Sequence, residues 1–286
     1  MRPRVPSHFH VSVEAGALVF RSQRRKITLD GRHFQEFVDS LLPLLDGSNT
    51  VAQIHEKVAS IFTPASVDAA LALLAENRLL EDGAPSAQIA QHNFLFEAGA
   101  PPDADARLAA ATVAIIGSSE VAKYASGIGH VRIADSENDI DGAQFVVCCP
   151  DHGRASLLYR VNRACHKARI PWTSASVSGF EAILGPTVIP GATPCYLCYK
   201  MRSIACADNP GEEFELERSP AAIKDRENTA FASGAAGHLL GLEAMKFLAG
   251  LAPSMLGSIA VLDFLSMTLT RHKVLRKPAC PICYGQ

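Results

Sequence analysis

Two Cys-x-x-Cys pairs, far apart in the sequence, constrain the fold of this chain more than any other feature. Cys195 and Cys198 form the first pair, and Cys280 and Cys283 form the second, with 81 residues (199–279) between the pairs. A Cys-x-x-Cys segment lets two sulfur atoms converge on one ion, and two such segments supply the four thiolates of a tetrahedral zinc site. Because all four ligands come from the protein, no coordination position is left for water. The pattern predicts one structural zinc ion that ties the C-terminal tail to an earlier loop.

The cellular setting supports thiolate ligands over disulfides. All eight cysteines lie in the second half of the 286 residues, and the start MRPRVPSHFH has no apolar segment of the kind found in signal peptides. A secreted disulfide scaffold would be shorter and denser in cysteine. Two independent pairs of free thiols and a redox-active pair are the alternatives, but a redox pair belongs at a strand-to-helix turn, where neither pair is expected. No apolar run reaches the roughly 18 residues needed to cross a bilayer. We expect a cytoplasmic protein.

The first 82 residues show the pattern of a small separate domain. Short alternating runs predict three strands, near 9–13, 18–20 and 26–29, and helical spacing predicts three helices, near 31–42, 51–58 and 64–78. Three strands and three helices in this order indicate a winged-helix-like domain over 1–82. Gly and Pro in residues 83–104 predict a linker that contacts its neighbour once, through the apolar run 94–96.

The remaining residues, 105–286, alternate between strand and helix patterns. A continuous apolar run at 112–116 is typical of a strand buried on both faces, and further strands are expected at 131–134, 145–149 and 171–175. Together with a helix over 156–167, they predict an α/β domain with a Rossmann-like, doubly wound parallel sheet. A helix near 229–248 and two strands near 259–264 and 268–275 predict an antiparallel hairpin at the sheet edge.

A nucleotide site is suggested by position but not by the residues of its loop. Gly117 follows the first strand, where a dinucleotide fold turns toward phosphate, and Asp135 follows the second, where a ribose carboxylate would stand. The loop continues Ser-Ser-Glu-Val-Ala, so the second and third glycines of the motif are absent. Glu120 would also place a negative charge near phosphate. A sheet retained for packing is the favoured interpretation.

The segments PGATPCYLC and PACPIC, together with FVVCCPD and Pro171-Trp172-Thr173, make residues 105–286 similar to ThiF-type proteins. Those relatives of the ubiquitin-activating enzymes hold zinc with two such cysteine pairs. The resemblance implies that Asp135 and Asp151 correspond to the acids that bind ribose and magnesium. The glycine-rich loop is mostly lost, however, and residues 136–142 contain no Arg or Lys. Adenylyl transfer needs cations to neutralise developing charge, so we expect a pseudoenzyme that does not use ATP.

Residues 9–80 resemble PqqD-like RiPP recognition elements, which bind a precursor's leader peptide as an added strand between the third strand and the third helix. The resemblance implies a peptide site on the third strand and third helix, and Leu71 and Leu74 could equally belong to the core. The basic flank would favour an acidic leader; a solvated charge run on a protected edge strand is the other interpretation. The candidate residues are Arg24, Arg25, Lys26, Ile27, Leu71, Leu74 and Arg78.

Both halves together resemble the ocin-ThiF-like, or F-type, partners of YcaO cyclodehydratases in thiazole/oxazole-modified peptide biosynthesis. The resemblance implies a non-catalytic scaffold that presents a precursor peptide to the YcaO enzyme for azoline formation. The alternative is an ATP-dependent adenylating enzyme acting on a peptide carboxylate. A DNA-binding regulator is a third hypothesis, but a net charge of −2 and acidic helices argue against nucleic acid. No membrane partner is expected, and the oligomeric state, a homodimer included, stays open.

Overall fold

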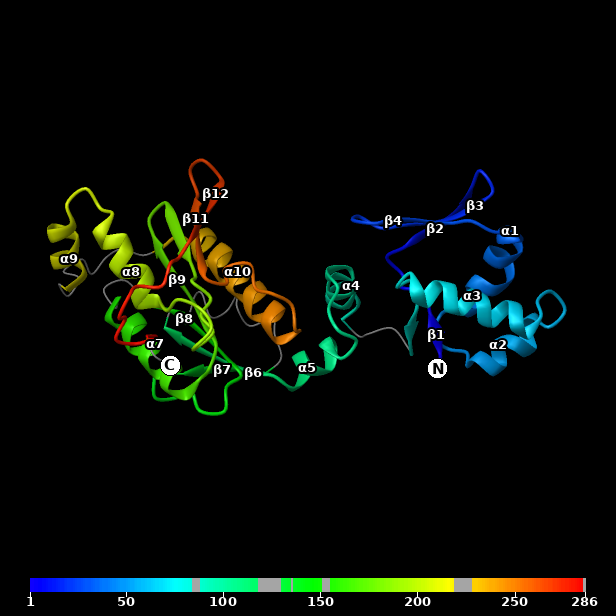
Figure 1. Ribbon diagram of the computed structural model, residues 1–286, viewed down its shortest axis with the longest axis horizontal. Coiled ribbons are helices and arrows are strands. Elements are labelled where there is room, and N and C mark those ends of the chain that lie inside the picture. Colours follow the sequence, from blue (N-terminus) through cyan, green and yellow to red (C-terminus); the bar gives the residue numbers. More distant parts are fainter. Residues whose placement is uncertain (84–87, 118–129, 135, 151–154, 219–227, 285–286) are drawn as a thin grey trace. The chain divides into compact units, whose positions relative to one another are not determined.

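The computed structural model describes residues 1–83, 88–117, 130–134, 136–150, 155–218 and 228–284. The chain divides into two compact units, Met1–Gly99 and Ala100–Gln286, which are described separately (Figure 1). The division falls inside the segment 83–104, which the sequence predicted to be a linker.

A three-stranded antiparallel meander forms the first unit's sheet, as predicted, with the strand order β2-β3-β4. A separate two-stranded ribbon, β1 with β5, joins the start of the unit to residues that follow its third helix, and was not predicted. Leu18 and Phe20 of the central strand point into the core and are at most 2% exposed. The strands are β1 (Pro3–Arg4), β2 (His10–Glu14), β3 (Ala17–Arg21), β4 (Lys26–Leu29) and β5 (Glu81–Asp82).

Helices cover the meander and complete an apolar core. Thr50 begins α2 with a capping box that includes Gln53, and Thr63 begins α3, which has Pro64 in its first turn. Ile54 and Leu74 are among the core residues that these helices supply. The helical segments are α1 (Phe34–Glu36), the π-helical turn η1 (Phe37–Leu41), the 3₁₀ turn η2 (Leu42–Leu44), α2 (Val51–Val58), α3 (Pro64–Glu76) and α4 (Ile89–Ala98).

The helix α4 lies within the stretch that the sequence predicted to be a linker. Its Leu95 is buried, and its Phe96 packs against the core of the first unit with ring contacts to His8 and Phe9. The single apolar contact predicted for 94–96 is therefore present, but as part of a helix that extends the first unit to Gly99.

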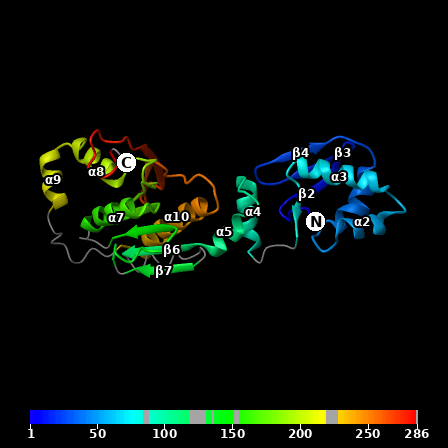
Figure 2. The same cartoon turned by 60° about the horizontal axis from the view of Figure 1, so that its bottom comes forward.

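A seven-stranded mixed sheet with the order β12-β11-β10-β9-β8-β6-β7 forms the second unit. Four strands, β9, β8, β6 and β7, are parallel, and Figure 2 shows β6 and β7 as arrows pointing the same way. The other three are antiparallel and end in the predicted edge hairpin. The strands are β6 (Thr112–Gly117), β7 (His130–Ala134), β8 (Phe145–Cys149), β9 (Trp172–Ser178), β10 (Glu181–Leu184), β11 (Ser258–Asp263) and β12 (Thr268–Lys273).

Both faces of this sheet are covered, as a doubly wound fold requires. On one face, Val146 and Cys148 pack with Val161 of α7. On the other, Phe145 meets Phe247 of α10 with ring centroids 5.3 Å apart. None of the helices in the described part of the chain is both long and apolar enough to cross a membrane. The helices are α5 (Ala104–Ala110), α7 (Ala155–Ala168), α8 (Tyr196–Ala205), α9 (Pro210–Arg218) and α10 (Ala230–Leu248).

Candidate functional sites

The side chains of the two Cys-x-x-Cys pairs converge in one buried cluster. The four cysteines are at most 1% exposed, and their sulfur atoms lie within 4.8 Å of one another. Cys195 Sγ lies 3.8 Å from Cys198 Sγ and 3.7 Å from Cys280 Sγ. Cys198 Sγ lies 3.4 Å from Cys283 Sγ. The predicted convergence of these four side chains is confirmed.

The cluster has the dimensions of a tetrahedral zinc site. Zinc–sulfur bonds of about 2.3 Å give sulfur–sulfur edges of about 3.8 Å, close to the observed separations, whereas a disulfide would need about 2.05 Å. Burial raises the pKa of the Cys195 thiol, and it raises the pKa of Cys283 to about 11. Burial also opposes ionisation of Cys280, but backbone N–H groups of Cys283 and Ile282 outweigh it and lower its pKa to about 7. Four thiolates therefore require a cation, and these residues fit zinc.

Contacts around the cluster fix the C-terminal tail to α8. The backbone N–H of Lys277 donates to Cys198 Sγ at 3.3 Å. Arg202 of α8 donates to the carbonyls of Leu275 and Arg276, at 2.9 and 3.2 Å. A zinc ion held by Cys195, Cys198, Cys280 and Cys283 would close the same connection covalently, with all four positions taken by protein.

The carboxyl edge of the parallel strands is where an open α/β sheet binds nucleotides, and here two strands approach closely. β6 and β8 are neighbours, although β7 follows β6 in the chain, so the strand order reverses between them. Gly117 ends β6 with φ +109°, and a Cβ atom there would lie 2.0 Å from the carbonyl oxygen of Cys149. Packing against β8 alone is enough to require glycine at this position. Asp135 and Asp151 lie outside the described residues, as does most of the loop after Gly117.

A cation that the sequence analysis missed lies beside this edge. The Nε atom of Arg160, on α7, lies 2.7 Å from Glu137 Oε1. Residues 136–142 contain no Arg or Lys, and Arg160 comes instead from the helix that follows β8. The sequence could have indicated this cation, because Arg160 lies in the first turns of a helix that starts at the carboxyl edge of the sheet. The guanidinium is already neutralised by a carboxylate.

The third strand of the meander, β4, forms the end of its sheet. In the part of the chain that the structure describes, β3 is its sole neighbour. α3 lies below the meander that contains β4 in Figure 1. Arg24, in the turn before this strand, and Lys26, its first residue, are exposed. The Lys26 ammonium lies 4.0 Å from Glu14 Oε2, and Ile27 is half-buried against the core. This strand therefore presents an open edge with cations at one end.

Arg25 differs from its two neighbours because it is bound within the first unit. Its Nε atom lies 3.5 Å from Glu97 Oε1, and its guanidinium lies over the rings of Phe9 and Phe96, 5.1 and 5.7 Å from their centroids. Glu97 also contacts His8 Nε2 at 2.7 Å. The sequence analysis missed this role for α4, although it had noted the apolar run that precedes Glu97.

The three candidates from the third helix fall into two groups. Leu71 and Leu74 are 5% and 1% exposed and belong to the core, so they offer no surface to a peptide. Arg78 is exposed with φ +55°, and its carbonyl accepts a hydrogen bond from Arg25 Nη2 at 3.4 Å. The exposed Arg78 therefore lies near the basic end of β4.

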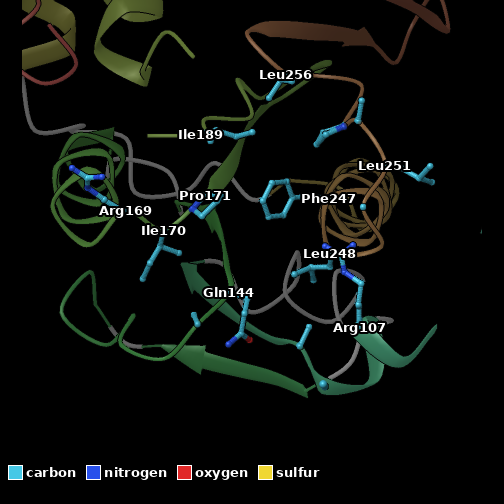
Figure 3. Close-up of a pocket in the computed structure, with 16 residues that line it drawn as sticks. Arg107, Gln144, Arg169, Ile170, Pro171, Ile189, Phe247, Leu248, Leu251 and Leu256 are labelled. Atoms are coloured by element: carbon cyan, nitrogen blue, oxygen red, sulfur yellow. The ribbon is translucent and has the colours of Figure 1, made fainter. Parts of the chain in front are cut away.

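A hollow of about 880 Å³ lies at the opposite edge of the large sheet (Figure 3). Ala111, Gln144 and Pro171, which line it, directly precede β6, β8 and β9, so the hollow is at the amino edge of the parallel strands. Phe247 and Leu248 of α10 supply much of its apolar wall (Figure 3). Its position excludes it as the nucleotide-type site beside Gly117.

Comparison with protein-family models decides the classification of the second unit. The model described as the ThiF family matches residues 106–282. The chain belongs to the ThiF family. The match includes all of the sheet and three of the four clustered cysteines, whose order and spacing carried the resemblance.

This ThiF-family chain has curated relatives in cyanobacteria. It is 29% identical over 123 residues to the heterocyst protein HesA of Trichormus variabilis, and 28% identical over 123 residues to HesA of a Nostoc species. These matches cover 43% of this chain and 40% and 42% of the relatives. The matched segment thus spans well under half of each relative.

Solved structures resemble the ThiF-family chain over both units. The heterocyclase TruD has a TM-score of 0.79 at 21% identity, with 99% of this chain and 42% of the TruD chain covered. MccB of E. coli, in its structure with a succinimide, has a TM-score of 0.67 at 16% identity, with 100% of both chains covered. Another MccB structure contains ATP. At these identities the similarity shows a shared fold, and this chain spans less than half of TruD.

Proposed function

We propose that this ThiF-family chain is a non-catalytic scaffold that binds the leader of a ribosomally made precursor peptide and presents that peptide to a YcaO-type cyclodehydratase for azoline formation. In this proposal the first unit is a PqqD-like, winged-helix-like recognition element. The second unit, held together by one structural zinc ion, supports the contact with the catalytic partner.

The open edge of β4 is the observation that carries the proposal. An extended peptide can add to such an edge through main-chain hydrogen bonds, while side-chain pockets provide specificity. Arg24 and Lys26 are exposed at its start, and Ile27 is half-buried along it. Cations there favour an acidic or amphipathic leader, because opposite charges speed association and disfavour other partners.

The shared fold gives the proposal its biochemical setting. TruD is a heterocyclase, and one structure of a heterocyclase with the same fold contains substrate and cofactor. The similarity covers 98–99% of this chain, so it includes the first unit as well as the ThiF-family unit. We propose a YcaO-type protein as the partner that supplies ATP-dependent catalysis.

Charge reversal at β4 tests this proposal. The affinity of a fluorescently labelled acidic leader peptide from a ribosomally made precursor would be measured by anisotropy with the full chain. We expect Arg24→Glu with Lys26→Glu to weaken binding at least tenfold, while reversal of the exposed Arg163 on α7, R163E, leaves the affinity unchanged. Equal affinities for all three proteins would overturn the assignment of β4.

The adenylating alternative depends on Arg160, a cation beside the carboxyl edge that would have to exchange its ion pair with Glu137 for a phosphate. In that function the chain would activate a peptide carboxylate as an adenylate and release pyrophosphate. Peptide-dependent exchange of labelled pyrophosphate into ATP by the purified chain would support it. If R160A folds normally but loses that exchange, Arg160 is the cation that the adenylation step needs. No exchange above background is expected if the chain is a scaffold.

A further inference from the structure

Large apolar side chains are exposed together at one corner of the seven-stranded sheet. The corner is built from the turn between β9 and β10 and the loop between β11 and β12. These two segments touch, since the N–H of Phe264 donates to the carbonyl of Phe180 at 2.8 Å. We call this corner the tip patch; its residues and exposed fractions are Phe180 (64%), Leu265 (72%), Met267 (78%) and Leu269 (54%).

The strand β12 continues from the tip patch along an open edge of the sheet. It is the terminal strand of the sheet order, and all six of its side chains are exposed. The backbone N–H of Val274 points toward β11 and donates to the carbonyl of Gly257. Along a strand the backbone N–H and C=O groups of successive residues point to opposite sides, so those of Leu269, Arg271 and Lys273 point away from β11. No strand in the described part of the chain pairs with them.

The charge of the β12 edge indicates which kind of strand could bind there. β12 carries two cations, Arg271 and Lys273, and no acidic residue. The neighbouring Asp263, at the end of β11, is bound by the backbone N–H groups of Leu265 and Ser266. A second copy of the chain would bring the same positive charge against it, whereas an acidic strand would be attracted. Lysine on an edge strand also discourages aggregation, but protection of that kind does not account for exposed Leu265, Met267 and Leu269.

We infer that β12 and the tip patch are a docking site for an extended acidic segment of a separate partner chain. The segment would add to β12 as a strand, and its apolar side chains would cover the tip patch. Identification of the partner as the YcaO-type enzyme rests on the proposed function. Leader binding at β4 and partner docking at β12 then use different edges in different units.

Calorimetric binding of a purified YcaO-type cyclodehydratase to this chain tests the inference. Met267→Asp with Leu269→Asp places negative charge on the tip patch and should weaken binding at least tenfold. The matched control is Leu216→Asp, at an α9 side chain that is 64% exposed, and it should change affinity less than twofold. A second pair of variants separates the contribution of charge from that of backbone hydrogen bonding. Lys273→Gln removes the charge alone, whereas Lys273→Pro removes both the charge and an outward N–H group. The proline variant should bind several-fold more weakly than the glutamine variant.

The outcomes separate this inference from the proposed function. If the partner binds all the folded variants with unchanged affinity, the docking site is wrong, although a scaffold role survives. If the partner fails to bind the wild-type chain while the leader binds, the partner assignment and this inference both fail. If sedimentation shows a wild-type dimer that the Met267→Asp, Leu269→Asp variant converts to monomer, a second copy occupies the edge and the inference is overturned. Each variant's leader affinity and Trp172 fluorescence report intact folding.

Discussion

Cys195 Sγ lies 3.7 Å from Cys280 Sγ, although 85 positions separate the two residues in the chain. The contact joins the loop before α8 to the C-terminal tail, which follows β12, the last strand of the chain. The surrounding hydrogen bonds, from Lys277 N–H to Cys198 and from Arg202 to Leu275, reinforce the same connection.

We predict about one zinc ion per chain, removed by substitution of either pair. Cys198→Ser should abolish stoichiometric zinc and destabilise the second unit by about 3 kcal/mol or more, because loss of a structural metal is among the costliest changes. Metal analysis and thermal unfolding followed by Trp172 fluorescence measure both, and the expected fall in Tm is roughly 6–12 °C. Cys206→Ser, at an exposed cysteine outside the cluster, is the control. Stoichiometric zinc in the Cys198→Ser variant would contradict the assignment.

We predict opposite roles for two adjacent arginines. Arg25→Ala removes an ion pair to Glu97 and two cation–π contacts, a loss of about 1–2 kcal/mol. Amide exchange in α4 should then accelerate roughly 5- to 30-fold. Arg24→Ala, at an exposed side chain, should leave that exchange unchanged while weakening leader binding. Equal exchange in the two variants, measured by mass spectrometry, would show that Arg25 does not hold α4.

The carboxylate of Glu243, 2% exposed on α10, fixes the loop before β11. It accepts hydrogen bonds from the N–H groups of Ser254 and Met255, both at 2.7 Å, and from Thr187 Oγ1 at 3.2 Å. Glu243→Ala leaves these donors without a partner and should cost about 3 kcal/mol, with Glu243→Gln costing less. Urea unfolding followed by Trp172 fluorescence measures the loss. Glu215→Ala, on the exposed face of α9, should stay within about 0.5 kcal/mol of wild type.

The tip patch should respond to acid through Asp263. Hydrogen bonds from the backbone N–H groups of Ser266 and Leu265 lower the pKa of this carboxyl below its ordinary value of about 3.9. Its contribution to folding is therefore present above the unfolded pKa and is lost as pH falls through the lower folded pKa. Titration of the Leu265 and Ser266 amide shifts by NMR should give a midpoint below about 3.9, absent in Asp263→Asn. A midpoint above that value would show that the carboxylate does not hold the loop.

The sequence predicted the features that depend on local pattern or on ligand chemistry. Alternation of apolar residues located the start of the meander, the continuous apolar run at 112–116 located the first parallel strand, and the two Cys-x-x-Cys pairs located the buried cluster. These succeed because each rests on a short period or a strict spacing that a single sequence displays.

The features that escaped prediction depend on contacts between distant segments. Gly and Pro around α4 suggested a linker, but Phe96 and Glu97 contact Phe9 and Arg25, residues far earlier in the chain. Arg160 pairs with Glu137 across two elements in the same way. Side-chain burial also separated the core residues Leu71 and Leu74 from the exposed Arg78, which helical spacing could not do. Only the folded topology brings such residues together.

Reconstitution of heterocycle formation tests the central claim most directly. The purified YcaO-type protein, ATP and the precursor would be incubated with and without this chain, and the peptide's mass would be followed. The scaffold account predicts loss of water from the precursor when both proteins are present, little modification without this chain, and no precursor-dependent ATP consumption by this chain alone. Precursor-dependent formation of AMP and pyrophosphate by this chain without the partner would contradict the account.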